Sequence, residues 1–139
     1  MKKLIPMITI LIILSGCELY EQDEYQEYYV VESYLVANDD LQQVRLSTTS
    51  PIEETYSFKD NTVSGASVEI QKLHSDSTVA DQYQYMQQQP GIYIPVDSTT
   101  IEAKQLYRLK ATTQDGHEIT SITYVPGDFR TLSELEPSY

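Results

Sequence analysis

The sequence predicts an all-β fold, an immunoglobulin-like antiparallel β-sandwich of about seven strands. From residue 28 onward, short segments alternate apolar and polar residues, which is the period of a half-buried strand. Turn residues separate these segments at roughly the spacing found in sandwich domains. No segment of this region has the 3.6-residue period of an amphipathic helix. We therefore expect two packed antiparallel layers over residues 28–126, preceded by a separate amino-terminal region.

The first 16 residues have the pattern of a cleaved signal peptide. Lys2 and Lys3 give a basic start, the stretch 4–14 is mostly apolar, and small residues precede Cys17. As a helix, the apolar stretch would span about 16 Å, whereas the hydrocarbon core of a bilayer is about 30 Å thick. The segment is therefore too short for a transmembrane helix and is expected to be removed.

Cys17 is the only cysteine, and it follows Leu14, Ser15 and Gly16. This tetrapeptide resembles the bacterial lipobox. In lipoproteins with that motif the thiol receives a diacylglyceryl group, the signal is cut before the cysteine, and the new amino group is acylated with a chain such as palmitate. The alternative is an ordinary signal peptide with an incidental cysteine. It is disfavoured because no second cysteine exists to form a disulfide. We therefore expect lipid attachment at Cys17.

Residues 17–27 form an acidic tether. They contain five acidic residues and no basic one. Like charges repel and extend a polar segment, so a flexible spacer between lipid and domain is one interpretation. The other interpretation is a targeting signal, here called an address. Acidic residues just after a lipidated cysteine resemble the signal for export to the cell surface in some Gram-negative groups. The sequence leaves both interpretations open.

The expected strands of the sandwich follow in order. They lie at residues 28–36, 43–47, 66–71, 81–86, 92–96, 105–113 and 117–125, with a short edge strand near Tyr56 and Phe58. The positions expected to face inward are Val44, Leu46, Ala66, Val68, Ile70, Tyr107, Leu109 and Ala111. Pro95 cannot donate to a ladder, so the strand at 92–96 must be an edge strand or end there.

Turn residues separate the expected strands. Turns are expected at 38–40, 64–65, 74–77 and 87–91, and a hairpin is expected at Asp115-Gly116, where glycine accepts a positive φ. Pro126 and Gly127 end the last strand. The tail, residues 127–139, has Leu132 and Leu135 but no partner strand. It is either the start of a segment that is truncated here or a frayed end.

The charge of the chain limits its partners. Loss of Lys2 and Lys3 with the signal leaves seven basic against 21 acidic residues, a formal charge of −14. Such a chain repels the phosphates of nucleic acid, so nucleic acid is not an expected partner. Anionic lipid headgroups would repel it as well. The acyl chains on Cys17 must therefore hold it to the membrane, and about two chains suffice for stable anchoring.

Residue types that carry chemistry are sparse. His74, Ser75 and Asp76 are adjacent, whereas a catalytic triad is assembled in space. We expect His74 in an exposed loop and His117 as a solvated hairpin residue, which leaves too few ligands for zinc. The acidic turn at 38–40 lacks the spacing and glycine of a calcium loop. We therefore expect no catalytic residue, no metal and no cofactor, and a protein that is not an enzyme.

The chain has twelve tyrosines, two phenylalanines and no tryptophan. Tyrosine suits half-buried strand positions and also surfaces that contact other proteins. Core positions and an exposed patch for a protein partner are both interpretations that the sequence allows.

Three stretches together resemble a known family. They are the lipobox followed by residues 29–35, the stretch 63–70, and Pro90-Gly91-Ile92-Tyr93 followed by residues 106–109. They are similar to the amino-terminal part of a large Bacteroidota lipoprotein family of unknown function, over roughly residues 17–126. The chain departs from the family pattern in two ways. Ser33 stands where glycine is common, and family members usually continue well beyond this sandwich, whereas this chain stops. The resemblance brings no catalytic residues.

Members of that family often lie beside TonB-dependent outer-membrane receptors. The resemblance therefore implies a non-enzymatic lipoprotein of the cell outer membrane that is an accessory or binding module for an uptake receptor. The alternative is a structural or adhesive surface sandwich without a transport role. Whether the protein faces the periplasm or the exterior stays open.

Overall fold

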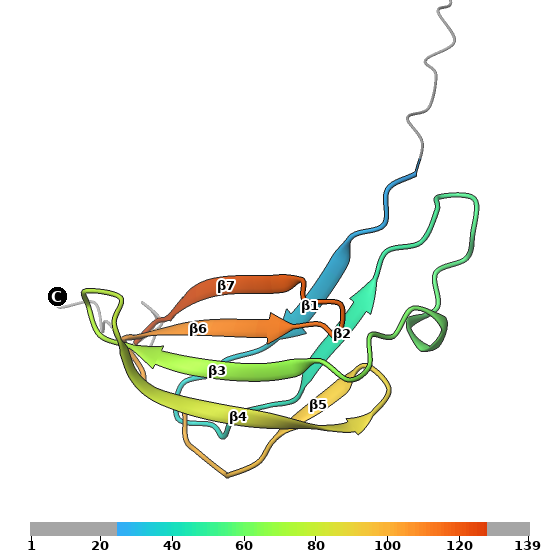
Figure 1. Cartoon of the computed structure of the whole chain (residues 1–139). Helices are drawn as coiled ribbons and strands as arrows, with labels where there is room; N and C mark the ends of the chain where they lie inside the picture. The colour runs from blue at the N-terminus through green and yellow to red at the C-terminus, as the bar shows by residue number, and fades with distance from the viewer. Residues whose placement is uncertain (1–24, 128–139) are drawn as a thin grey trace, which may run out of the picture.

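The computed structural model describes residues 25–127. The expectations for the signal peptide, Cys17, most of the tether and the tail lie outside these residues. The elements are β1 Tyr29–Ser33, β2 Val44–Thr48, the 3₁₀ helix η1 Phe58–Asp60, β3 Ser67–Leu73, β4 Val79–Gln89, β5 Ile92–Pro95, β6 Gln105–Thr112 and β7 Glu118–Val125 (Figure 1). The prediction of an all-β fold with seven antiparallel strands is confirmed.

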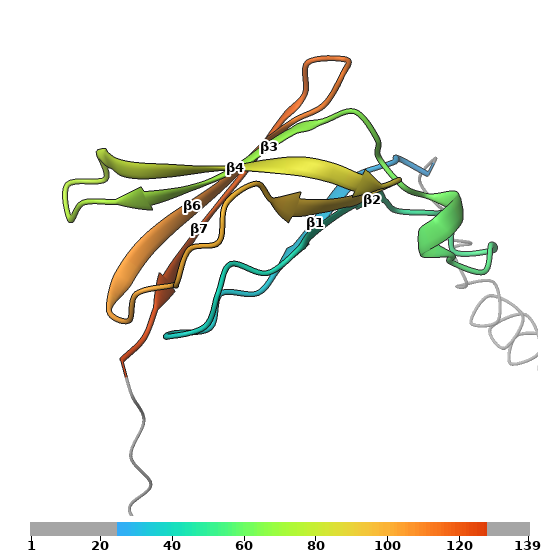
Figure 2. The same cartoon turned by 90° about the horizontal axis from the view of Figure 1, so that it is seen from below.

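The seven strands form one continuous sheet in the order β1-β2-β5-β4-β3-β6-β7. Every neighbouring pair is antiparallel. The sheet is strongly curved, so the two packed layers of the sandwich are two halves of the same sheet (Figure 2). β1 and β7 are its edges. Because the strand directions alternate across an odd number of strands, these two edges run in the same direction.

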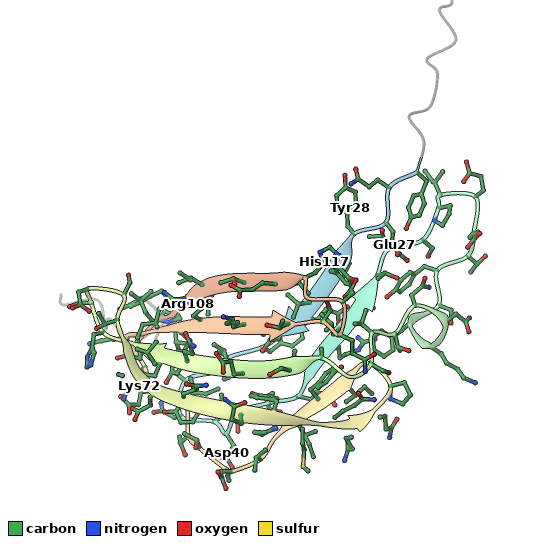
Figure 3. All side chains as sticks on the ribbon, in the orientation of Figure 1. Glu27, Tyr28, Asp40, Lys72, Arg108 and His117 are labelled. Atoms are coloured by element: carbon green, nitrogen blue, oxygen red, sulfur yellow. The ribbon has the colours of Figure 1, made fainter. Side chains whose placement is uncertain are left out.

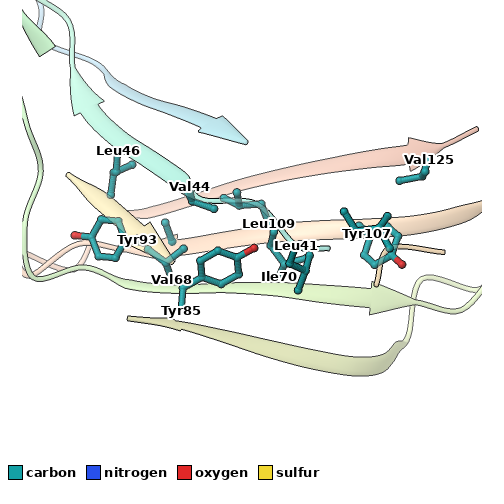
Figure 4. Packing of buried hydrophobic residues seen from close by; sticks show 12 residues of the cluster. Leu41, Val44, Leu46, Val68, Ile70, Tyr85, Tyr93, Tyr107, Leu109 and Val125 are labelled. Atoms are coloured by element: carbon teal, nitrogen blue, oxygen red, sulfur yellow. The ribbon is translucent and has the colours of Figure 1, made fainter. Parts of the chain in front are cut away.

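The core lies on the concave side of the sheet (Figure 4). Val44 and Leu46 of β2 have no exposed surface, and alternate residues of β6, Tyr107, Leu109 and Ala111, are at most 8% exposed. These inward positions are confirmed, as are Val68 and Ile70 of β3. Ala66 precedes β3 and is only partly buried against the core. Burial of alternate residues explains why the period-two pattern identified these strands.

Three buried tyrosines connect the core to loops. The Tyr85 hydroxyl donates to Gln42 O at 3.0 Å, and the Tyr93 hydroxyl donates to Val63 O at 2.9 Å. The hydroxyl of Tyr107 accepts from Glu102 N–H at 2.9 Å. Each ring therefore fills the core while its hydroxyl satisfies a loop backbone group, which phenylalanine could not do.

The expected edge strand near Tyr56 and Phe58 is wrong. That segment contains η1 instead, with N–H groups of Asp60 and Asn61 donating to carbonyl groups three residues earlier. β2 pairs with β1 along one edge, and β5 occupies its other edge only at Val44 and Arg45. The rest of that edge is paired with residues 61–63, which follow η1, through the Ser47–Thr62 bridge, so the pairing residues lie a few positions later than expected. The Phe58 ring lies 4.0 Å below the guanidinium of Arg45 and is held there by a cation–π contact.

The turn predicted at 87–91 is shorter than expected. Residues 87–89 belong to β4, because pairing with β5 continues through Gln87 and Gln89 across a register shift. The reversal itself is confined to Pro90 and Gly91, and Gly91 has a φ of +69°. β5 lies inside the sheet and ends at Pro95. Of the two expectations for this segment, an edge strand or a strand that ends at the proline, the second is therefore confirmed. The Asp115-Gly116 hairpin is confirmed, with a φ of +90° at Gly116.

Candidate functional site: the seam between the edge strands

The edge strands β1 and β7 approach each other at their amino-terminal ends without pairing, and we call the space between these two strands the seam. The Tyr29 hydroxyl on β1 donates to the Asp115 carboxylate at 3.1 Å, and the rings of Tyr29 and His117 lie 5.5 Å apart. The Nε2 atom of His117 is 3.3 Å from the same carboxylate. We call Tyr29, Asp115 and His117 the latch. As expected, His117 lies on the hairpin with its side chain exposed, at the end of the sheet where β1 begins (Figure 3).

The latch changes the acidity of its members. The Thr113 hydroxyl donates to the Asp115 carboxylate, which lowers the pKa of Asp115, and the Tyr29 hydroxyl acts in the same direction. Partial loss of water raises the pKa of Tyr29, and the negative acceptor Asp115 raises it further. Asp115 is therefore ionised and Tyr29 is neutral near pH 7, which is the state that the hydrogen bond requires.

Beyond the latch the seam opens into a cavity of about 250 Å³. Its walls are residues of β1 and β7, with Tyr34 and Leu35 just after β1, and core side chains form its floor. The floor residues are Ile70, Tyr107 and Leu109. The cavity between the two edges therefore reaches the hydrophobic core, whose side chains at the floor are at most 8% exposed.

β7 is exposed on both faces. Ser121 and Thr123 are paired with Leu109 and Tyr107 and so point to the core side, yet both are exposed. On the outer side Ile122 is 54% and Tyr124 is 56% exposed. An edge strand normally covers the core with one face. Exposure on the inner face shows that the strand lacks a neighbour beyond it.

A serine hydroxyl in the cavity wall has no hydrogen-bond partner among the described residues. The Oγ atom of Ser33, at the end of β1, is buried and unpaired. Buried polar side-chain atoms in folded proteins are paired in the large majority of cases.

A second hollow, of about 480 Å³, lies at the latch end of the seam. Three carboxylates line it, those of Glu27, Asp60 and Asp115. No lysine or arginine is among the described residues that line it. The hollow therefore favours a positively charged group.

The residues His74 and Asp76 form part of the turn between β3 and β4. The Asp76 carboxylate accepts from the N–H group of Thr78 at 3.0 Å and from its hydroxyl at 2.6 Å, and these bonds lower the pKa of Asp76. His74 is exposed and bonds within the turn through its backbone. Because β3 and β6 are antiparallel, this turn lies at the opposite end of the sheet from His117. The structure therefore brings no triad together at His74.

The acidic turn 38–40 is tied to a neighbouring loop. The Asp40 carboxylate accepts from the hydroxyls of Ser98 and Thr100 at 3.0 and 3.2 Å, and the N–H group of Asn38 donates to Ile101 O. Within residues 25–127, no three side chains of histidine, cysteine, aspartate or glutamate are placed to hold a metal ion. Likewise, no helix in this part of the chain is long and apolar enough to cross a membrane.

The profile of a protein family described as a domain of unknown function, DUF4249, matches residues 18–130. The chain belongs to the DUF4249 family. The match includes all seven strands of the sheet and both sides of the seam. No curated protein and no solved structure matches the chain. The DUF4249 assignment therefore gives the family of the chain but no activity.

The seam is the part of the site that sequence reasoning missed. The returning strand at 117–125 was predicted, but not that two of its inward positions, Ser121 and Thr123, are polar. Ser121 and Thr123 stand opposite Leu109 and Tyr107, so in this DUF4249 domain the middle of the inner face of β7 is more polar than that of β6. This difference was the available signal that β7 is an incompletely covered edge.

Proposed function

We propose that this DUF4249 protein is a lipid-anchored, non-enzymatic lipoprotein of the cell outer membrane, of the kind found in Bacteroidota. In this proposal it is an accessory or binding module for a TonB-dependent uptake receptor. The observation that carries it is the lipobox at residues 14–17 with its single cysteine. Acyl chains on Cys17 would hold a strongly acidic domain at a membrane that its charge does not attract.

Two further features support a binding role. The family match begins at Glu18, directly after the proposed lipid site, so tether and sheet are parts of one family unit. The seam presents a cavity with an apolar floor and a partly polar wall beside an acidic hollow, and such a combination can orient a partner. The exposed tyrosines Tyr34 and Tyr124 line the same cavity and suit a protein contact.

Affinity purification from detergent-solubilised membranes tests the receptor role. A carboxyl-terminal tag on the full chain should retain an outer-membrane receptor of the TonB-dependent class in stoichiometric amount. A matched preparation from cells producing Cys17→Ser should lose it, because that variant does not reach the membrane. Recovery of the membrane-bound protein without any such receptor would contradict the uptake role and favour the structural or adhesive sandwich.

A further inference from the structure

We propose that the free edge of β7 binds an extended segment of a partner protein as an added antiparallel strand. Its inward side chains would enter the seam cavity, and a basic side chain at its carboxyl-terminal end would reach the acidic hollow. The inference rests on the proposed function, because it describes how a binding module of this kind holds its receptor. Addition of a strand to an exposed sheet edge is an established mode of peptide recognition.

The edge of β7 carries none of the usual protection against strand pairing. Natural edge strands are blocked by charged residues, proline, bulges or short length. Residues 119–125 contain no charged residue and no proline, and their ladder with β6 runs over eight residue pairs without a register shift. The strand is therefore a regular template, with β-branched or aromatic residues at most positions.

The ladder determines which backbone groups of β7 face the free edge. Thr113 N–H donates to His117 O, so this pair is hydrogen-bonded, and hydrogen-bonded pairs alternate with non-bonded pairs along an antiparallel ladder. Ser121 and Thr123 continue the bonded set. The N–H and C=O groups of Thr120, Ile122 and Tyr124 then point away from β6, into the seam.

The direction of the added strand follows from that of β7. A strand antiparallel to β7 has its carboxyl-terminal end beside Glu118, next to the latch and the acidic hollow. Glu118 is itself neutralised by Lys110 at 2.8 Å, whereas Glu27 and Asp60 make no ion pair within the described residues. A lysine or arginine is therefore favoured at that end of the partner strand, and apolar residues are favoured at the alternate positions above Leu109 and Tyr107.

Two other occupants fit less well. A second copy of β7 contains no basic residue for the acidic hollow, since its only charged residue is Glu118. Gly127, the last described residue after β7, lies beside Lys104 just before β6, since an added Cβ would be 2.7 Å from the Lys104 side chain. The charge of the hollow thus selects a basic partner strand.

Synthetic peptides test this directly on the full chain. The probe is a peptide of eight alternating valine and threonine residues followed by two lysines at its carboxyl-terminal end. One control has the same composition with the valines grouped together, and a second has the lysines at the amino-terminal end. We expect saturable binding of the probe, measured by fluorescence anisotropy, and at least about tenfold weaker binding of each control.

Amide hydrogen exchange locates the bound strand. Without peptide, the amides of Thr120, Ile122 and Tyr124 should exchange rapidly, and those of Ser121 and Thr123 slowly. Saturating probe should slow exchange at the first three positions and leave the other two unchanged. Slowing elsewhere, or no slowing with measurable binding, would overturn the assignment to β7.

Two variants of the edge complete the test. Ile122→Pro removes an amide that makes no ladder bond in this assignment, and Ile122→Lys places on the free edge a charged residue of the kind that blocks strand pairing in natural edge strands. Both should weaken binding about tenfold or more, and the lysine variant keeps the test decisive if the proline variant fails to fold. The matched control, Val79→Lys on β4, should bind as the unmodified chain does.

Equal binding by all variants, binding of an acyl chain instead, or self-association through β7 would each overturn the proposal. None of these outcomes depends on Cys17 or on the receptor, so the proposed function can fail separately.

Discussion

At the scale of single residues, the buried tyrosines show how the sequence combines packing with hydrogen bonding. Tyr93 has no exposed surface, yet its hydroxyl donates to Val63 O and accepts from Ala66 N–H at 3.1 Å. One side chain therefore fixes the loop that precedes β3. Of the two interpretations of the tyrosines, the core role holds for Tyr85, Tyr93 and Tyr107. Others, including Tyr34 and Tyr124, are exposed.

Tyr93→Phe should lower the free energy of unfolding by about 1–3 kcal/mol, because it removes two hydrogen bonds to half-buried backbone groups, the carbonyl of Val63 and the amide of Ala66. Urea denaturation measures this. The control Tyr124→Phe changes an exposed ring and should alter stability by less than about 0.5 kcal/mol. Equal effects would contradict the hydrogen bonds assigned to Tyr93.

The latch predicts a dependence of stability on pH. The pKa of Asp115 is lowered in the folded protein, chiefly by the Thr113 hydroxyl. The unfolded chain therefore binds more protons, and stability rises with pH through the acid range. The contribution is complete above the ordinary aspartate pKa of about 3.9 and is lost as the pH falls through the lowered value. Asp115→Asn should flatten the slope of the thermal midpoint between about pH 5 and pH 2.

At the scale of elements, close packing around turns determines which glycines can be replaced. Gly91 joins β4 to β5 with a φ of +69°, and an added Cβ would lie 2.7 Å from Leu46 O and 2.9 Å from the Thr62 side chain. Gly116 has a similar backbone requirement, with a φ of +90°, but nothing lies within 4 Å of its added Cβ. The two turns therefore separate backbone strain from steric overlap.

Gly91→Ala should destabilise the protein by more than about 2 kcal/mol, since strain at positive φ and contact with backbone add together. Gly116→Ala should cost about 1 kcal/mol, from the backbone conformation alone. Chemical denaturation of both variants gives the comparison. Similar losses would show that the structure around Gly91 relaxes more easily than its contacts indicate.

The alternation of β6 allows a second comparison. Leu109 is 8% exposed and forms part of the cavity floor, so Leu109→Ala should cost about 2–5 kcal/mol. Lys110 points to the other side and pairs with Glu118 at the surface, so Lys110→Ala should have a far smaller effect. A larger loss for Lys110→Ala would mean that the assignment of faces is wrong.

The strands were predictable where alternation reports burial directly, as for Val44 and Leu46 in β2 or the inward residues of β6. Turn chemistry identified Gly65, Gly91 and Gly116, all of which have positive φ. Prediction failed where strand order decides the outcome. The residues of this connection that pair with β2 are 61–63, after Phe58, and Gln87 to Gln89 are strand residues because β5 pairs with them. The seam depends on which strands end up at the edges, and a single sequence does not contain that order.

At the scale of the whole molecule, the acidic tether distinguishes a spacer from an address. Changing Glu18, Glu21, Asp23, Glu24 and Glu27 to glutamine keeps length and polarity and removes only charge. If the tether is an address, the variant should be lipidated and folded, yet intact cells should no longer expose it to external protease. The thermal midpoint should barely move, which separates failed export from misfolding. Unchanged protease sensitivity would support the spacer interpretation.

Lipid attachment at Cys17 is the claim on which the localisation and the receptor role both depend. The most direct measurement is metabolic labelling with a traceable fatty acid, followed by membrane fractionation of cells that produce the full chain or Cys17→Ser. The account predicts a labelled, processed, membrane-bound chain, and a Cys17→Ser variant that is unlabelled, unprocessed at residue 17 and no longer retained through acyl chains. A Cys17→Ser chain that is still labelled, cut before residue 17 and membrane-bound would contradict it.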